Sequence, residues 1–341
     1  MVNFRIFIAL SLALSLAQVL PAQAATVPSF VGAHTGPIGT LTVSDPKVAG
    51  KYTANTLVSI GGHWLVLPRG TAGFDISFTD GGATRRFLVV RPEPANSGAA
   101  AFMMLHGSGG TPEAQANLTS IGNAVVADGF WAVLPESLDN EWNDNPGYST
   151  GVDDVGFNAK VIDIVTGYLH LDAKRVFVSG LSDGAFMAER LGCELSDRIA
   201  AVALVAGTMS NGLSSACEPA TPRPIMFIDG TADPIVPYDG GRLGVMSAPD
   251  AFSFWLSRHN CTASSTMNTA LPDVANDGTT ISVARNAGCG SGGEVRLYTV
   301  TNGGHTWPGG SQYLPESMIG KTSADMNAND EIWSFFSAHP L

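Results

Sequence analysis

RVFVSGLSDGAFMAERLGCE, residues 175 to 194, is the stretch that decides the fold. Its apolar start, 175–179, predicts a buried strand, and residues 183–194 predict a helix. Gly180 and Gly184 flank Ser182 between the two, where a sharply turning backbone favours residues without a Cβ. Gly-x-Ser-x-Gly between a strand and a helix is typical of a nucleophile elbow, which holds a serine hydroxyl clear of a sheet.

Strands and helices alternate on both sides of this turn. Further strands are predicted at 100–105, 130–134, 199–206, 224–228 and 295–300, and further helices at 112–128, 155–169, 249–258 and 325–337. Thr111 is the expected N-cap of the helix that begins at Pro112. Such alternation indicates an α/β protein with a mostly parallel central sheet and helices on both faces. With the elbow, it predicts the α/β-hydrolase fold.

The first residues have the pattern of an export signal. One positive charge, Arg5, precedes an apolar run from Ile6 to Leu20, and Ala22-Gln23-Ala24 forms an Ala-x-Ala site. We therefore expect residues 1–24 to be a signal peptide that is cleaved after Ala24, which predicts a secreted protein, extracellular or periplasmic. No later run approaches the roughly 18 apolar residues of a membrane-spanning helix, so no membrane partner is expected.

After the signal peptide, we expect a short N-terminal segment followed by one catalytic domain. Residues 25–70 are rich in Gly, Pro, Thr and Val, and we interpret them as an irregular segment of loops with short strands. A hairpin follows, with strands at 74–78 and 86–90 around the turn Asp80-Gly81-Gly82. The catalytic α/β-hydrolase domain is then expected over 71–341, a length that suits a single large domain.

Charge excludes one class of partner. The 341 residues carry a net charge of −12, with 45% hydrophobic and 14% charged residues. Nucleic-acid binding depends on Lys and Arg that neutralise phosphates, so no nucleic-acid partner is expected. The glycine-rich stretch 106–110 lacks the Gly-Lys-Ser/Thr of a phosphate-binding loop.

A catalytic serine needs a base and an orienting acid, which follow in the order Ser, acid, His in this fold. His305 stands in Asn302-Gly303-Gly304-His305-Thr306-Trp307-Pro308-Gly309, a loop just after the last predicted strand. The strand before it is followed by two carboxylates, Asp229 and Asp233. We prefer Asp233, which lies in the loop, because turn chemistry can explain Asp229 at the strand end.

Backbone donors for an oxyanion are expected at two positions. Leu105-His106-Gly107-Ser108-Gly109-Gly110 follows the first core strand, where such enzymes have a donor loop. We expect the N–H groups of Ser108 and Asp183 to form the oxyanion hole. The carboxylate of Asp183 is otherwise explained by its place in the first turn of a helix, and Asp153 and Asp154 also stand where a helix cap would lie.

Aromatic residues in the long loops are candidates for binding substrate. Trp142 and Trp307 are expected to line the cleft, together with Tyr148, although aromatic residues in loops are about as often packing residues.

Four cysteines in an exported chain favour two disulfides. The sequential pairing, Cys193 with Cys217 and Cys261 with Cys289, is the simplest of three connectivities. Buried free thiols are the alternative. The spacing gives no Cys-x-x-Cys or close Cys/His pattern, so no metal site is expected.

Taken together, the motifs resemble the polyhydroxybutyrate depolymerase and feruloyl esterase family over residues 85 to 338. The likeness is carried by Leu105-His106-Gly107-x-Gly109-Gly110, Val152-Asp153-Asp154-Val155-Gly156-Phe157, Gly180-Leu181-Ser182-x-Gly184, Ala200 to Gly207, Gly230-Thr231-x-Asp233-x-x-Val236-Pro237-Tyr238 and Gly304-His305-Thr306-Trp307-Pro308-Gly309. Ser108, where many relatives have Cys, and Asp229, where many have His, depart from the pattern.

The resemblance implies a serine esterase without a cofactor, with Ser182, Asp233 and His305 as its triad, and the family's cysteine positions fit the sequential pairing. We expect a depolymerase-like enzyme that cleaves hydroxyalkanoate esters, as small molecules, oligomers or polymers. The alternatives are a feruloyl or acetyl esterase acting on plant polysaccharide, a peptidase of the same fold, and a binding protein that has lost catalysis.

Overall fold

The structure is a computed structural model that describes residues 31–146, 151–290 and 293–341. The expected signal peptide, residues 1–24, lies outside these ranges, as does Tyr148. Within the described residues, no helix has both the length and the apolar character needed to cross a membrane.

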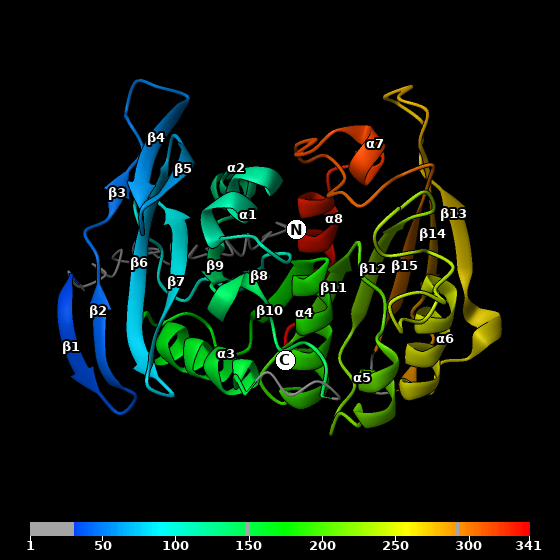
Figure 1. Cartoon of the computed structure of the whole chain (residues 1–341), viewed down its shortest axis with the longest axis horizontal. Coiled ribbons are helices and arrows are strands. Elements are labelled where there is room, and N and C mark those ends of the chain that lie inside the picture. Colours follow the sequence, from blue (N-terminus) through cyan, green and yellow to red (C-terminus); the bar gives the residue numbers. More distant parts are fainter. Residues whose placement is uncertain (1–30, 147–150, 291–292) are drawn as a thin grey trace, which may run out of the picture.

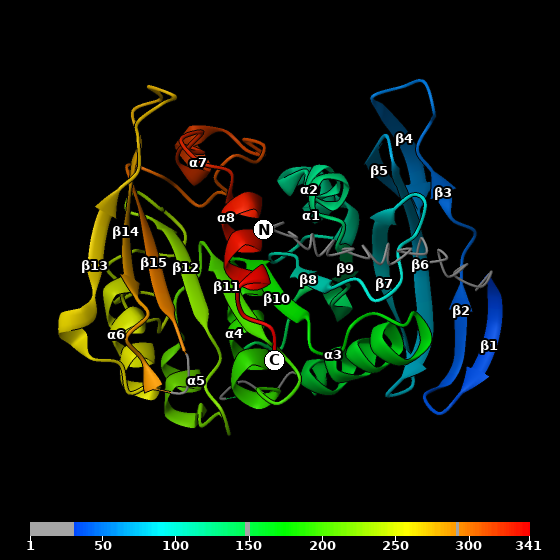
Figure 2. The same cartoon turned by 180° about the vertical axis from the view of Figure 1, so that it is seen from behind.

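One mixed sheet runs across the whole molecule (Figures 1 and 2). Its strand order is β1-β2-β6-β7-β9-β8-β10-β11-β12-β15-β14-β13, and β3 pairs with β6. The strands are β1 (Gly32–Gly36), β2 (Gly39–Val43), β3 (Lys47–Val48), β6 (Thr71–Asp80), β7 (Ala83–Pro92), β8 (Ala101–Leu105), β9 (Trp131–Pro135), β10 (Val176–Leu181), β11 (Ala201–Val205), β12 (Ile225–Gly230), β13 (Met267–Ala270), β14 (Thr280–Asn286) and β15 (Val295–Thr301).

The centre of the sheet, from β9 to β15, is parallel. Antiparallel strands flank it on both sides, with β1, β2, β6 and β7 on one side and β14 and β13 on the other. The parallel centre agrees with the sequence-based prediction. The edge strands β13 and β14 were not predicted, because their alternation is short and β13 is exposed along its whole length.

Helices cover both faces of the parallel centre, as Figures 1 and 2 show from opposite sides. On one face of the sheet, Met103 and every second residue along the central strands are buried against α3 (Asp154–Asp163), α4 (Asp183–Glu194) and α6 (Ala248–Arg258). On the opposite face, Phe102 and the strand residues in between are buried against α1 (Pro112–Thr119), α2 (Ile121–Asp128) and α8 (Ala328–Ser337). Each fully buried Phe, Leu or Met side chain contributes about 1.5–3 kcal/mol to folding, so the two-sided burial fixes the layers.

Two predicted helices are interrupted. The helix expected over 112–128 breaks at Ser120, whose φ of 53° ends α1 and precedes α2, although Thr111 caps α1 as expected. The helix expected over 155–169 is α-helical only to Asp163 and continues as a π-helix, Ile164–Tyr168. The smaller helices are α5 (Asn211–Ala216), α7 (Glu316–Ile319) and the 3-10 turns Leu138–Asn140 and Ala263–Ser265.

The N-terminal segment is more regular than its sequence predicts. Strands β1, β2 and β3 extend the main sheet, because β2 and β3 pair with β6 through registers such as Leu41 opposite Phe78. Strands β4 (Asn55–Ile60) and β5 (His63–Pro68) form a separate hairpin. The short strands expected within 25–70 are thus present in its described part, where they pair in an ordered way, and residue 70 marks no boundary in the sheet.

The predicted hairpin and disulfides are present. Strands β6 and β7 pair from Thr71 opposite Pro92 to Asp80 opposite Ala83. Cys193 and Cys217 are joined by an S–S bond of 2.01 Å, and Cys261 and Cys289 by one of 2.00 Å. The sequential connectivity is confirmed, and no free cysteine remains among the described residues.

Candidate active site

Ser182 stands at the sharp turn between β10 and α4, with φ 57° and ψ −122°. A Cβ on Gly180 would lie 2.1 Å from the carbonyl oxygen of Gly184, and a Cβ on Gly184 would lie 2.4 Å from that of Leu105. Both positions therefore exclude any side chain. The Gly-x-Ser-x-Gly pattern is the steric condition for bringing this turn against the end of β8.

The carboxylate of Asp233 orients the ring of His305. Its Oδ2 accepts a hydrogen bond from His305 Nδ1 at 2.7 Å, and its Oδ1 accepts from the N–H groups of Ile235 at 2.7 Å and Val236 at 2.9 Å. Because Nδ1 carries the proton in this pair, Nε2 of the neutral ring is left as the acceptor. The side chains of His305 and Asp233 are almost fully buried, at 4% and 2% exposure.

The loop that carries His305 is fixed by the segment around α7. The His305 N–H donates to Ile319 O at 2.6 Å, and the Tyr313 hydroxyl donates to His305 O at 2.9 Å. A Cβ on Gly304 would lie only 2.0 Å from the carbonyl oxygen of Ile319. The glycine before His305 is thus required by a close backbone approach.

Ser182 and His305 open into one cavity of about 660 Å³. The loop 107–110 lines the same cavity, and most of the remaining wall is apolar: Ala114, Leu118, Leu181, Ile235, Tyr313, Leu314 and Ile319, with Gln115, Asn117 and Ser311 as polar members. Sequence reasoning missed this wall. Most of its residues come from α1 and from loops, with Leu181 at the end of β10 and Ile319 at the end of α7, and no periodic pattern marks them as facing substrate.

The two expected oxyanion donors lie on adjoining backbone segments. Ser108 lines the cavity, and a Cβ on the neighbouring Gly107 would lie 3.4 Å from the Ser182 Cβ. Asp183 begins α4, so its N–H has no acceptor within the helix. The Ser108 hydroxyl donates to Glu141, and the Gly109 N–H donates to Asn140 O at 2.9 Å, which ties the donor loop to residues 140–141.

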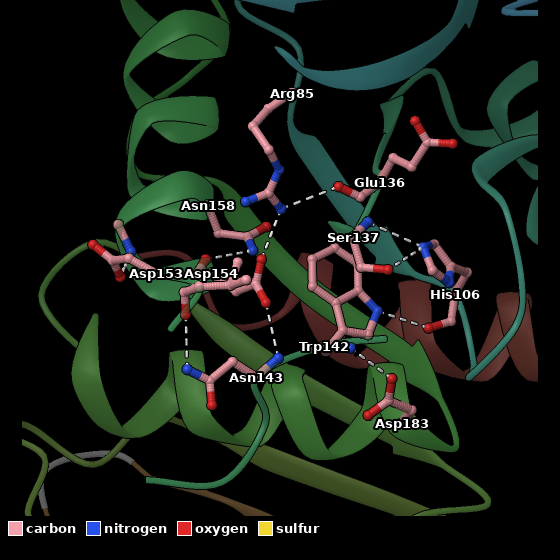
Figure 3. Close-up of polar contacts among 12 residues, drawn as sticks. Arg85, His106, Glu136, Ser137, Trp142, Asn143, Asp153, Asp154, Asn158 and Asp183 are labelled. Carbon is pink, nitrogen blue, oxygen red and sulfur yellow. Dashed lines mark hydrogen bonds and ion pairs between the residues drawn. The ribbon is translucent and has the colours of Figure 1, made fainter. Parts of the chain in front are cut away.

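Trp142 joins the donor loop to the elbow (Figure 3). Its indole Nε1–H donates to His106 O at 2.9 Å, and its backbone N–H donates to Asp183 Oδ2 at 2.9 Å. The Ser137 N–H donates to His106 Nε2 at 3.2 Å, so Nδ1 carries the ring proton and donates to Gly107 O at 2.9 Å. Burial lowers the pKa of His106, which keeps this ring neutral.

A buried ion pair supports the segment that contains Trp142. Arg85 donates to Asp154 Oδ1 at 2.7 Å, and Asp154 Oδ2 accepts from the Asn143 N–H at 2.8 Å (Figure 3). Asp153 is the helix cap that the sequence suggested, since it accepts from the Gly156 N–H at 2.7 Å. Asp154 instead pairs with Arg85, a partner 69 residues away.

Neither tryptophan expected to bind substrate lines the cavity. Trp142 is 3% exposed and Trp307 is 0% exposed, and neither contributes to the cavity wall. Trp307 packs in the core layer that contains α8, because a large apolar ring gains more free energy from burial than from exposure in a loop. The packing interpretation is therefore the correct one for both rings.

Three buried carboxyl groups near the elbow have raised pKa values. Burial raises the pKa of Asp183 to about 8 and that of Glu189 on α4 to about 8. Burial, with the nearby charge of Asp233, raises the pKa of Asp229 well above its usual range, and one of its oxygens has no hydrogen-bond partner among the described residues. Burial thus disfavours the charged form of Asp229, and it is Asp233 that accepts the hydrogen bond from His305 Nδ1, so the geometry favours Asp233.

The fold and this arrangement of serine, histidine and carboxylate define a serine hydrolase of the α/β-hydrolase class. No family model matches the chain. It is 30% identical to "Putative esterase NocK" of Nocardia uniformis subsp. tsuyamanensis over 251 residues. The matched region covers 68% of this chain and 72% of that protein. The chain belongs to this esterase family and is a carboxylic-ester hydrolase.

Two further similarities are to a feruloyl esterase and to an acetyl xylan esterase. Feruloyl esterase B of Piromyces equi is 32% identical over 192 residues, which are 53% of this chain and only 34% of that longer protein. The solved structure of an acetyl xylan esterase from Aspergillus awamori superposes with a TM-score of 0.55 at 12% identity, over 77% of this chain and 98% of the other. The second similarity supports the α/β-hydrolase fold alone.

Proposed function

We propose that the chain hydrolyses carboxylic esters through an acyl-enzyme formed on Ser182. His305 Nε2 removes the proton of the Ser182 hydroxyl as it attacks the ester carbonyl, and then protonates the leaving alcohol. Water attacks the acyl-enzyme in the same way and releases the acid. The observation that carries this proposal is the 2.7 Å hydrogen bond from His305 Nδ1 to Asp233, in the cavity that Ser182 lines.

The N–H groups of Ser108 and Asp183 are the proposed oxyanion donors. They belong to two segments that Trp142 ties together, so their separation is fixed before substrate binds. A preorganised donor of this kind is worth about 10²–10³ in rate.

We propose that the acyl group is bulky and aromatic, as in feruloyl esters of plant polysaccharide. A cavity of about 660 Å³ with an apolar wall is larger than an acetyl group requires. The name of the Piromyces relative supports a feruloyl group as the acyl part. Hydroxyalkanoate esters are the competing substrate, favoured by the motif resemblance and by aliphatic wall residues such as Leu118 and Ile235.

A substrate panel tests both parts of this proposal. Wild-type protein and Ser182→Ala are compared on methyl ferulate, acetylated xylan, 3-hydroxybutyrate trimer and a peptide anilide, with fluorophosphonate labelling of the serine. We expect labelling of the wild type alone, and the highest kcat/KM on methyl ferulate. Faster cleavage of the trimer would assign the enzyme to hydroxyalkanoates, and cleavage of the anilide alone would identify a peptidase.

Export is part of the proposal. The two disulfides are typical of an oxidising compartment, and residues 1–24 have the pattern of a signal peptide. N-terminal sequencing of the protein from the culture medium or periplasm should begin at Ala25. A cytoplasmic protein that retains Met1 would contradict it.

A further inference from the structure

The β4–β5 hairpin has one apolar face that is open to solvent. Leu57 is 61% exposed, Trp64 is 64% exposed and Val66 is 41% exposed. Leu57 lies opposite Val66 in the register, and Trp64 lies opposite Ser59, so the three side chains form one patch on two paired strands. Exposed patches that contain a large aromatic ring commonly mark a contact surface.

The opposite face anchors the hairpin to the main sheet. Ile60, Leu65 and Leu67 are buried, and they lie against Gly73 of β6, where a Cβ would come within 3.0–3.4 Å of their side chains. The absence of a side chain at Gly73 therefore lets the hairpin lie close to the sheet. The exposed patch therefore lies on a hairpin whose other face packs against the main sheet.

Asn117 on α1 connects the hairpin to the catalytic cavity. Its Nδ2 donates to Trp64 O at 2.8 Å, and its Oδ1 accepts from the Val66 N–H at 2.9 Å. Asn117 also lines the cavity that contains Ser182. Figures 1 and 2 show the hairpin, α1 with α2, and α7 along the same edge of the molecule.

A polar hollow lies beside the patch. It measures about 170 Å³ and is lined by Asn55, Val66, Pro68, Ala116, Asn117, Ser120, Gly122 and Asn123. Amide and hydroxyl groups of this kind both donate and accept hydrogen bonds, as sugar hydroxyls do. Residues 55–68 contain no Asp, Glu, Lys or Arg, and His63 is their one ionisable side chain, so the hairpin itself offers little charge to an ionic ligand.

We propose that the exposed face of the β4–β5 hairpin and the adjoining hollow form a docking surface for the neutral polysaccharide chain to which the ester is attached. The Trp64 ring packs on the apolar face of a sugar ring, and the amides of the hollow bind its hydroxyls. Contact with the cavity through Asn117 places this chain next to the scissile ester. The proposal deepens the proposed function and rests on its polysaccharide-ester substrate.

Adsorption to insoluble, ester-free xylan tests the surface without catalysis. Trp64→Ala should weaken adsorption at least about fivefold, whereas Trp64→Phe, which retains a ring, should stay within about twofold. Met267→Ala is the matched control, because Met267 is 59% exposed on β13 at the opposite edge of the sheet. Rates on methyl ferulate should be equal in all variants, since Trp64 does not line the cavity.

Three results would overturn the proposal. Xylan adsorption that is unchanged in Trp64→Ala removes the docking surface. Trp64-dependent adsorption to polyhydroxybutyrate film without xylan binding assigns the patch to polyester. A wild-type dimer in light scattering that dissociates in Trp64→Ala assigns it to a second copy of the chain. If adsorption depends on Trp64 but methyl ferulate is not cleaved, the docking surface stands and the proposed acyl specificity fails.

Discussion

The nucleophile elbow and the donor loop 106–110 adjoin each other at the cavity, but different interactions hold them. The elbow is determined by its own backbone: Gly180 and Gly184 permit contacts that any side chain would block, and the Ser182 N–H donates to Val205 O at 3.0 Å. The donor loop is instead held by hydrogen bonds to another segment, residues 137–142, among them the bond from the Trp142 indole to His106 O.

This difference determines how each region should respond to mutation. A backbone-determined turn retains its shape when the serine side chain is changed, so the loss is chemical. A loop held by hydrogen bonds from residues 137–142 shifts when one of them, such as the Trp142 indole bond, is removed, although every reacting group remains. Four predictions, from the largest expected effect to the smallest, test this distinction and the residues that support the two regions.

Ser182→Ala should reduce kcat/KM on methyl ferulate by at least about a thousandfold and leave the melting temperature near that of the wild type. Ser108→Ala is the control, because it removes a hydroxyl at the same cavity but keeps the proposed N–H donor, and it should stay within about tenfold. Residual activity of Ser182→Ala within tenfold of the wild type would refute the nucleophile assignment.

Asp233→Asn should lower kcat by at least about a hundredfold, because an amide at this position favours the wrong tautomer of His305. Asp229→Asn should change kcat less than about fivefold, since Asp229 makes no hydrogen bond to His305 and burial already disfavours its charged form, which an amide of the same shape also lacks. Steady-state kinetics of the two variants give the ranking. The reverse order would make Asp229 the orienting acid.

Trp142→Phe should lower kcat about tenfold with little change in KM, since it removes the hydrogen bond to His106 O and loosens the donor loop. Trp307→Phe makes the same chemical change at a buried ring whose Nε1 has no hydrogen-bond partner among the described residues. That control should remain within about twofold of the wild type. Equal losses in the two variants would show that Trp142 acts only through packing.

Glu189→Gln tests the buried carboxyl groups beneath the elbow. Burial raises the pKa of Glu189 to about 8 in the folded protein, so between its unfolded pKa and pH 8 the unfolded chain releases a proton that the folded chain keeps. This group therefore contributes most stability at low pH and loses that contribution as pH rises toward 8.

The glutamine variant retains an acceptor for the Trp255 indole, which donates to Glu189 Oε1 at 2.7 Å, but it cannot titrate. We expect the melting temperature of the wild type to fall by several degrees more than that of Glu189→Gln between pH 5 and pH 8. Identical pH profiles would show that the folded-state pKa is not raised.

The sequence predicted best what the backbone determines locally. The helix after Ser182 begins and ends at the predicted residues, Asp183 and Glu194, and the carboxylate in contact with His305 is the one that the loop position favoured. The burial of Trp142 and Trp307 could not be predicted, because a ring in a loop packs against partners that lie far away in the sequence.

The edge strands of the sheet could not be predicted from the sequence either. Strands β1 and β13 are mostly or fully exposed, so they lack the alternation of apolar and polar residues that reveals a half-buried strand. Their place depends on pairing with β2 and β14. The break at Ser120 could not be predicted either, because no Gly or Pro at that position marks the end of α1.

The positive φ of Ser182 also limits how stable the chain can become while it retains its hydroxyl. A non-glycine residue held in such a conformation costs about 1–3 kcal/mol, a noticeable share of the roughly 5–15 kcal/mol that keeps a domain folded. Ser182→Gly would recover much of that free energy and abolish the chemistry. Laboratory selection for heat resistance alone should therefore enrich this replacement, so a screen for hardier variants must score turnover as well.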